Sequence, residues 1–159
     1  MGALVEVLVV AAVCCSGLVA GLFAGFGYAV MPGLRAVDDR AFVTSMQRIN
    51  AAILNPVFLP MFLGGLVLGG VAAWLVWSAA APGAWWAVAG AGLYLVVFLV
   101  TGAVNVPLNN ELAAGGEDTA ALRERFEGKW VRWNLVRAFA GVGSLLCWLI
   151  SLVTGVLAS

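Results

Sequence analysis

Long uninterrupted apolar runs dominate the chain, and their pattern predicts helices that cross a membrane. The runs that contain no charged residue cover residues 7–34, 49–110 and 138–159. A helix needs about 20 apolar residues to cross the hydrocarbon core of a bilayer. The middle run is therefore long enough for two helices, which separate at Pro82 and Gly83. We predict four membrane-spanning helices, at about residues 4–31, 56–77, 85–106 and 131–157.

The segments between the first two spans and between the last two also carry helical patterns. Apolar residues recur at offsets of four, three and four residues, at Phe42, Met46, Ile49 and Ile53. Asp38 or Asp39 can cap this amphipathic helix, and residues 117–129 form a second, charged helical segment. We therefore predict an all-α fold: one integral membrane domain, residues 1–159, built as a four-helix bundle with two polar helical loops on one side.

Composition supports a membrane protein rather than a soluble domain. Hydrophobic residues make up 64% of the chain and charged residues 10%, whereas soluble domains have about half and about a quarter. All eight Lys and Arg residues lie within residues 35–48 or 123–137, and the net charge is zero. The positive-inside rule predicts that these two segments are cytoplasmic and that both termini lie outside, and we expect the bacterial inner membrane. We expect membrane lipid, and no nucleic acid, as a partner.

Small residues in the first span form a stripe at four-residue spacing. Gly17, Gly21 and Gly25 would allow another helix to approach closely. The neighbouring helix belongs either to the same chain, which is the simpler interpretation, or to a second copy in a homo-oligomer.

Metal and redox chemistry find little support in the residue types. The chain has no histidine, which is the commonest ligand of haem, copper and catalytic zinc. Cys14, Cys15 and Cys147 have no neighbouring ligands and are best interpreted as small apolar core residues. We expect no metal site, although an all-carboxylate one stays open.

The start of the fourth span is the strongest candidate for a functional site. At about 100° per residue, an arc of roughly 100° on one helix face holds Trp130, Trp133, Asn134 and Arg137. Because the segment that follows is apolar enough to be buried in a membrane, these polar groups need partners inside the protein or in a wet cavity.

Further polar residues are predicted at the same end of the bundle. Asn105 and Asn109 are four residues apart and share a helix face, while Gln47 lies on the amphipathic helix. One interpretation is a buried network that locks the ends of the four helices together, formed by Asn50, Asn105, Asn109, Asn134 and Arg137. The other interpretation is a ligand site.

The same residues form an ordered set of motifs: Met46-Gln47-x-Ile49-Asn50, Asn55-Pro56-x-Phe58, Asn105-x-Pro107-Leu108-Asn109-x-x-Leu112 and Trp130-x-x-Trp133-Asn134-x-x-Arg137. In this order, and at these positions relative to the spans, they resemble the anthrone oxygenase-like family of small four-span membrane proteins. The resemblance covers essentially the whole chain. It implies a cofactor-independent oxygenase that uses O2 to convert a polyketide anthrone into the anthraquinone. Relatives commonly have a histidine where this chain has Leu135, which lies off the aromatic-polar face.

The chemistry that the resemblance implies gives each candidate residue a role. An anthrone that loses a proton becomes an electron-rich anion, which reacts with O2 directly. Arg137 would stabilise the substrate oxyanion, and Trp130 and Trp133 offer stacking surfaces. Hydrogen bonds to substrate oxygens would come from Asn105, Asn109 and Asn134, and the remaining candidates for substrate binding are Gln47, Asn50, Asn55 and Tyr28.

The base that removes the proton is less well defined. Glu111 directly follows the asparagine motif and is our first choice, ahead of Asp38 and Asp39. Alternatively, the positive charge of Arg137 is sufficient to make the substrate ionise.

Two other functions fit the same pattern. The protein could bind or transport a flat lipophilic molecule without reacting with it, or it could be a structural subunit of a membrane complex that assembles through the glycine stripe.

Overall fold

The computed structural model describes residues 2–157, which form helices and connecting turns without any strand. The elements in chain order are α1 (Ala3–Gly25), η1 (Phe26–Val30), α2 (Met31–Arg35), α3 (Asp39–Ala52), α4 (Phe58–Ser78), α5 (Ala84–Val100), η2 (Thr101–Asn105), α6 (Val106–Ala114) and α7 (Thr119–Leu157). Here η marks a π-helical turn.

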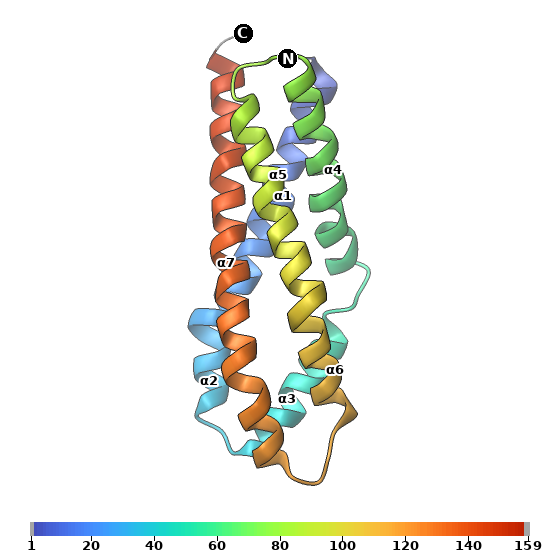
Figure 1. Cartoon of the computed structure of the whole chain (residues 1–159), viewed down its shortest axis with the longest axis vertical. Helices are drawn as coiled ribbons and strands as arrows, with labels where there is room; N and C mark the ends of the chain where they lie inside the picture. The colour runs from blue at the N-terminus through green and yellow to red at the C-terminus, as the bar shows by residue number, and fades with distance from the viewer. Residues whose placement is uncertain (1, 158–159) are drawn as a thin grey trace.

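Four long rods make up the bundle (Figure 1). The stretches long and apolar enough to cross a membrane are Ala3–Arg35, Phe58–Ser78, Ala84–Ala114 and Thr119–Gly155. α1 packs against α4 and α7, and α5 packs against the same two helices, so that the four rods surround a common core. The predicted all-α bundle of four spans is thereby confirmed.

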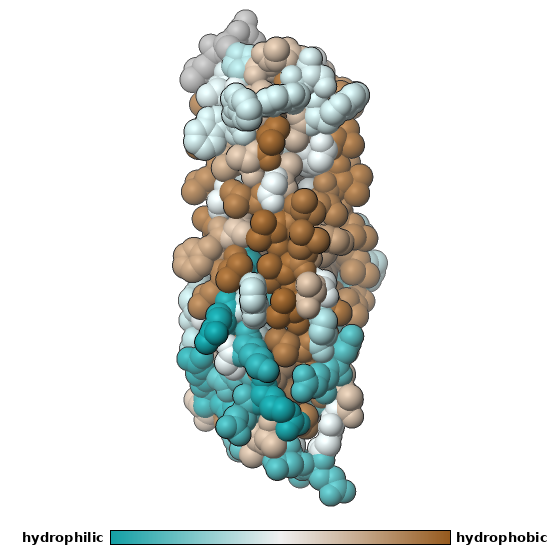
Figure 2. Space-filling model, viewed as in Figure 1, coloured by the Kyte–Doolittle hydropathy of each residue, from teal (hydrophilic) through white to brown (hydrophobic). Residues whose placement is uncertain are grey.

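The two ends of the bundle differ in polarity. α1 begins and α7 ends at one end, whereas α2, α3, α6 and the first turns of α7 lie at the other, which we call the polar end (Figure 1). Hydrophobic residues cover the middle of the surface, and hydrophilic residues gather at the polar end (Figure 2). This separation follows from the sequence, since the charged residues between the spans are confined to the segments that form the polar end.

The charged segment 117–129 and the fourth span form one continuous helix rather than two elements. α7 has 39 residues, which corresponds to a length of about 58 Å. The hydrocarbon core of a bilayer is about 30 Å thick. The segment contains no proline and is rich in good helix formers, so nothing interrupts the backbone hydrogen bonds before the apolar part begins.

Two π-helical turns interrupt the first and third rods. A proline follows each turn closely: Pro32 is the second residue of α2, and Pro107 is the second residue of α6. Proline lacks an N–H group and its ring clashes with the carbonyl of the preceding turn, so a widened turn there relieves the crowding. The apolar pattern of the sequence contains no sign of these turns.

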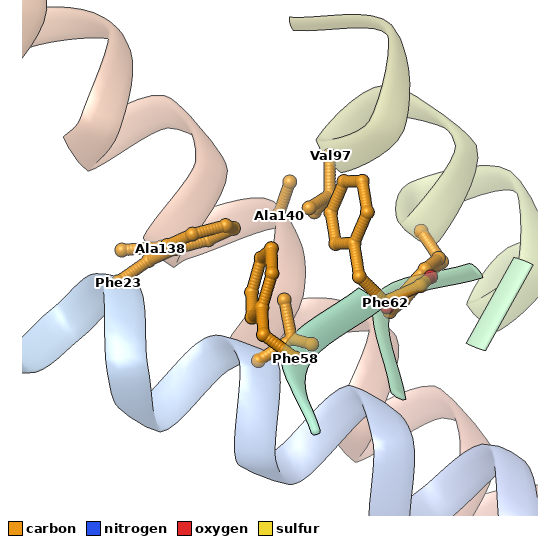
Figure 3. Close-up of a cluster of buried hydrophobic side chains, with 8 residues drawn as sticks. Phe23, Phe58, Phe62, Val97, Ala138 and Ala140 are labelled. Atoms are coloured by element: carbon orange, nitrogen blue, oxygen red, sulfur yellow. The ribbon is translucent and has the colours of Figure 1, made fainter. Parts of the chain in front are cut away.

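Aromatic rings packed on small residues fill the core. Figure 3 shows Phe23 of α1, Phe58 and Phe62 of α4 and Val97 of α5 converging on the small side chains of α7. Nearby, the Tyr94 ring lies directly against Gly65, and its hydroxyl donates to the carbonyl of Phe62 at 3.0 Å. Further along the bundle, Trp148 is fully buried between Gly69 and Gly90.

The glycine stripe of the first span is only partly used inside the chain. Gly17 faces Leu145 of α7, whereas no other residue approaches the position that a Cβ atom would occupy at Gly21. α1 and α7 approach each other closely at Ala20 and Gly141, where an added Cβ would lie 3.0 Å from that of Ala20. The predicted homo-oligomer contact through the stripe stays a prediction.

Arg123 ties the α2–α3 turn to α7 at the polar end. Its guanidinium donates to the carbonyls of Val37 (2.9 Å) and Arg35 (3.2 Å) and to the carboxylates of Asp39 (3.0 Å) and Glu127 (2.8 Å). One side chain thus satisfies two backbone carbonyls that the helix end leaves without partners.

The contact between Gly65 and Tyr94 leads to a first prediction. A methyl group at Gly65 would overlap the buried Tyr94 ring, so Gly65→Ala should lower the free energy of unfolding by about 1–3 kcal/mol. Thermal unfolding of the purified protein in detergent micelles measures the loss. Gly70→Ala is the matched control, because its Cβ enters open space and should cost no stability. Equal behaviour of the two variants would contradict this packing.

A second prediction concerns the Arg123 contacts. Arg123→Ala should destabilise the polar end by about 1–3 kcal/mol, since it removes the donor to the carbonyls of Val37 and Arg35 and to the carboxylate of Asp39. The Glu127 carboxylate keeps its bond from Arg35 at 2.8 Å. Arg40→Ala removes an exposed arginine of α3 and should change stability by less than about 0.5 kcal/mol. Denaturant titration in micelles compares them, and a loss of similar size in both variants would argue against a specific role of Arg123.

Candidate functional site

A cavity of about 280 Å³ lies in the half of the bundle nearer the polar end. It forms where α4 begins only at Phe58, so that α3 and the linker after it complete the wall on this side. The volume is near the lower limit of small-molecule sites, which span about 300–1,000 Å³. The aromatic residues of the wall are Phe23, Phe26, Phe58 and Trp130. Its polar residues are Gln47, Asn50, Thr101, Asn109, Asn110 and Arg137.

Among the residues that the structure describes, Arg137 is the only charged one on the cavity wall. Its side chain belongs to the apolar half of α7, and the residue is only 5% exposed. Within residues 2–157 it forms no salt bridge, and its Nε atom has no hydrogen-bond partner. A buried cation without a counter-ion is unfavourable unless a ligand or a polar network compensates it.

Two polar side chains and two aromatic rings hold the guanidinium in place. One terminal nitrogen donates to Asn134 Oδ1 at 2.9 Å and the other to Thr101 Oγ1 at 3.3 Å. The guanidinium carbon lies 4.1 Å from the centre of the Phe23 ring and 5.5 Å from that of Trp130. These contacts come from three helices, so they fix the position of the charge relative to the whole bundle.

Asn134 supports Arg137 from behind rather than lining the cavity. It is fully buried, and its Nδ2 donates to the carbonyl of Phe23 at 2.9 Å. Because its Oδ1 accepts from Arg137, this amide links α1 to the guanidinium.

Trp130 is held by the two asparagines of the third rod. Its indole Nε1 donates to Asn109 Oδ1 at 2.8 Å, and its backbone carbonyl accepts from Asn105 Nδ2 at 3.4 Å. The ring also packs against Phe26 and Phe126, with centroids 5.6 Å and 6.0 Å away. The indole therefore has one fixed orientation on the cavity wall.

The structure brings together most of the residues that the sequence singled out. Arg137, Trp130, Asn109, Gln47 and Asn50 line the cavity, and Asn105 and Asn134 are buried directly behind its wall. This arrangement is compatible with both interpretations given above, a buried polar network and a ligand site, because the asparagines form a network and the network borders a cavity.

Four other predicted residues lie away from the cavity. Trp133 is 38% exposed, since it stands at the edge of the helical arc and turns toward the outside of the bundle. Tyr28 is 77% exposed on η1. Asn55 uses its Oδ1 to accept from the backbone N–H groups of Val57 and Phe58, both at 2.9 Å, at the start of α4.

The fourth of these residues is Glu111, our first choice for the base. Its side chain is 56% exposed and lies 3.6 Å from Arg125 on the outer surface. Asp38 caps α3, and Asp39 pairs with Arg123. No carboxylate lines the cavity, and the described part of the chain holds no group of three or more acidic or Cys side chains close enough to bind a metal ion.

Sequence reasoning missed Thr101 and the phenylalanines of the wall. Thr101 lies at the start of η2, and its hydroxyl donates to the carbonyl of Val97 at 2.7 Å while accepting from Arg137. A lone threonine in an apolar run does not by itself indicate a functional residue. Its position one helical turn before Asn105 could have suggested that the two side chains share a helix face. Phe58 already stood in one of the motifs without a role.

Leu135 occupies the position where relatives commonly have histidine. It is 40% exposed, and its side chain lies beside Gly27 rather than in the cavity. The leucine therefore leaves the wall of the cavity unchanged.

One comparison with known proteins found a match to this chain. The family model described as anthrone oxygenase matches residues 56–147, a range that includes Thr101, Asn109, Trp130 and Arg137. No curated protein and no solved structure matches the chain. Because the family model covers more than half of the sequence, this protein belongs to the anthrone oxygenase family.

Proposed function

We propose that the protein is a membrane oxygenase that oxidises an anthrone-like polycyclic aromatic compound to a quinone with O2, without a cofactor. The observation that carries this proposal is Arg137: a buried guanidinium without a carboxylate partner, on the wall of a largely apolar cavity. Such a site favours a flat, lipophilic ligand that develops negative charge on an oxygen atom.

The first step is ionisation of the substrate. The carbon between the two outer rings of an anthrone carries two hydrogens, and loss of one as a proton leaves an anion whose charge is shared with the oxygen across the central ring. Arg137 stabilises this oxyanion in surroundings of low dielectric constant, where a charge interaction is much stronger than in water.

The second step is addition of O2 to the electron-rich carbon. The electron pair of the carbanion forms the new carbon–oxygen bond, and the terminal oxygen takes up a proton to give a hydroperoxide. Loss of the remaining C–H proton and cleavage of the O–O bond then release water and leave the quinone carbonyl. One oxygen atom of O2 enters the product and the other leaves as water, so no external reductant is required.

Arg137 also offers an answer to the question of the base. With Glu111, Asp38 and Asp39 directed elsewhere, we propose that Arg137 favours the ionised substrate strongly enough for water at the polar mouth of the cavity to accept the proton. We assign this mouth to Asn110, an exposed polar residue of the wall, and to Gln47, a half-buried one.

The orientation in the membrane remains part of the proposal. The basic residues of the polar end favour a cytoplasmic location of the cavity, with both chain termini on the outer side of a bacterial inner membrane. The substrate and O2 both partition into lipid, and the exposed apolar residues Leu54 and Val106 flank the cavity on its outer surface.

Turnover of 1,8-dihydroxyanthrone is the direct test. Purified protein in micelles should convert it to the quinone with one O2 consumed per product, and chelators should leave the rate unchanged. Arg137→Gln should lower kcat by about 10²–10³-fold, because it removes the positive charge that stabilises the oxyanion. Product absorbance and an oxygen electrode measure both quantities.

Arg132→Gln is the matched control for that variant. Arg132 stands on the same helix but is exposed, so its rate should stay close to wild type. Saturable binding of the anthrone without product would instead identify a ligand-binding or transport protein.

The two tryptophans provide an independent prediction about the wall. Trp130→Leu removes the ring that lines the cavity and should raise KM at least tenfold, whereas Trp133→Leu removes a ring on the outside and should leave KM near wild type. Steady-state kinetics compares the two variants. The opposite order would place the substrate on the outer face of α7.

A further inference from the structure

Two buried hydrogen-bond donors on the cavity wall have no partner within the described residues. They are Arg137 Nε, on α7, and Asn50 Nδ2, on α3. Buried polar atoms are almost always hydrogen-bonded in folded proteins, so each exception calls for an explanation. The other unpartnered atoms, of Asn105, Trp148 and Ser151, belong to residues that do not line this cavity.

Several other polar groups of the wall already have partners within the protein. Gln47 Nε2 donates to the carbonyl of Leu112 at 2.8 Å, and Asn109 Oδ1 accepts from Trp130 at 2.8 Å. The terminal nitrogens of Arg137 donate to Asn134 and Thr101. The buried hydrogen-bonding groups of the wall that remain without a partner are thus two donors, which come from two different helices.

We propose that Asn50 binds a second oxygen atom of the ligand, the one that the reaction installs across the central ring from the oxyanion held by Arg137. This inference rests on the proposed function, which puts oxygen at two separate ring carbons. Asn50 donates first to the hydroperoxide and then to the new quinone carbonyl. Two acceptors on the ligand thus match the two buried donors of the wall that have no partner among the described residues.

A pair of compounds that differ only at that carbon isolates the interaction. 1,8-dihydroxyanthrone has hydrogen there, and 1,8-dihydroxyanthraquinone has oxygen. Because Asn50 recognises the added oxygen, the wild-type protein should bind the quinone more tightly than the anthrone.

The experiment measures Kd for both compounds without O2, by tryptophan quenching in micelles. Asn50→Leu keeps a side chain of similar size but removes the amide, and should weaken quinone binding about tenfold while leaving anthrone binding unchanged. Thr44→Ala, an exposed change on the same helix, should behave as wild type. An unchanged preference for the quinone in Asn50→Leu, equal weakening of both compounds, or no binding by wild type would overturn the proposal.

Stability of the unliganded protein separates recognition from a structural role. Since Asn50 Nδ2 has no partner between residues 2 and 157, Asn50→Leu should unfold at the wild-type temperature or above. A lower Tm would show that the amide supports the fold instead.

Turnover in air then tests the proposed function separately. Binding with the expected quinone preference but no oxidation by wild type would refute the oxygenase and leave the role of Asn50 in recognition intact. Oxidation by wild type together with an unchanged preference in Asn50→Leu would refute the role of Asn50 alone.

Discussion

The burial of a guanidinium inside an apolar bundle is the constraint on which the arrangement of this protein depends. Arg137 has hydrogen bonds to α7 itself and to η2, and an aromatic ring of α1 beneath it. Each contact comes from a residue that is itself held: Asn134 by the backbone of α1, and Thr101 by the carbonyl of Val97. The charge therefore aligns three of the four rods, and the same alignment leaves room for a cavity beside it.

The second rod, α4, does not extend to the level of Arg137, which explains where the cavity lies. α4 starts only at Phe58, and α3 with its linker takes the place that a further turn of α4 would occupy. A shorter amphipathic helix fills less volume than a continuous span, so the space next to Arg137 stays open. The tightly packed layers around Tyr94 and Trp148, further along the bundle, have no such interruption.

Much of this architecture could be predicted from the sequence because its signals are local. Charge-free runs gave four spans, and helical geometry placed Trp130, Asn134 and Arg137 on one face. Trp133 shows the limit of such geometry, since a residue at the edge of the arc turns either inward or outward according to its neighbours. Glu111 shows another limit. It follows Asn109 and Asn110 in the sequence, but neighbouring residues on a helix point in different directions, and its side chain lies on the outer surface. The cavity itself depends on how the linker between α3 and α4 is placed. That placement is determined by the packing of segments that are distant in the sequence.

The π-helical turn η2 has a consequence for the evolution of this fold. A π turn uses one residue more than an α turn, so Thr101–Asn105 acts as a single-residue insertion in the third rod. Five residues of a π turn rotate the chain about as far as four residues of an α-helix, so the turn takes up the extra residue without changing the faces of the helix beyond it. If the same five residues were α-helical, everything beyond them would be rotated by roughly a quarter of a turn, and Asn109 would turn away from Trp130 while the core contacts of α5 stayed untouched. The π turn therefore sets the register between the membrane-embedded half of the rod and its asparagine-bearing half, and a homologue that lacks the extra residue could keep the same cavity wall with a regular helix.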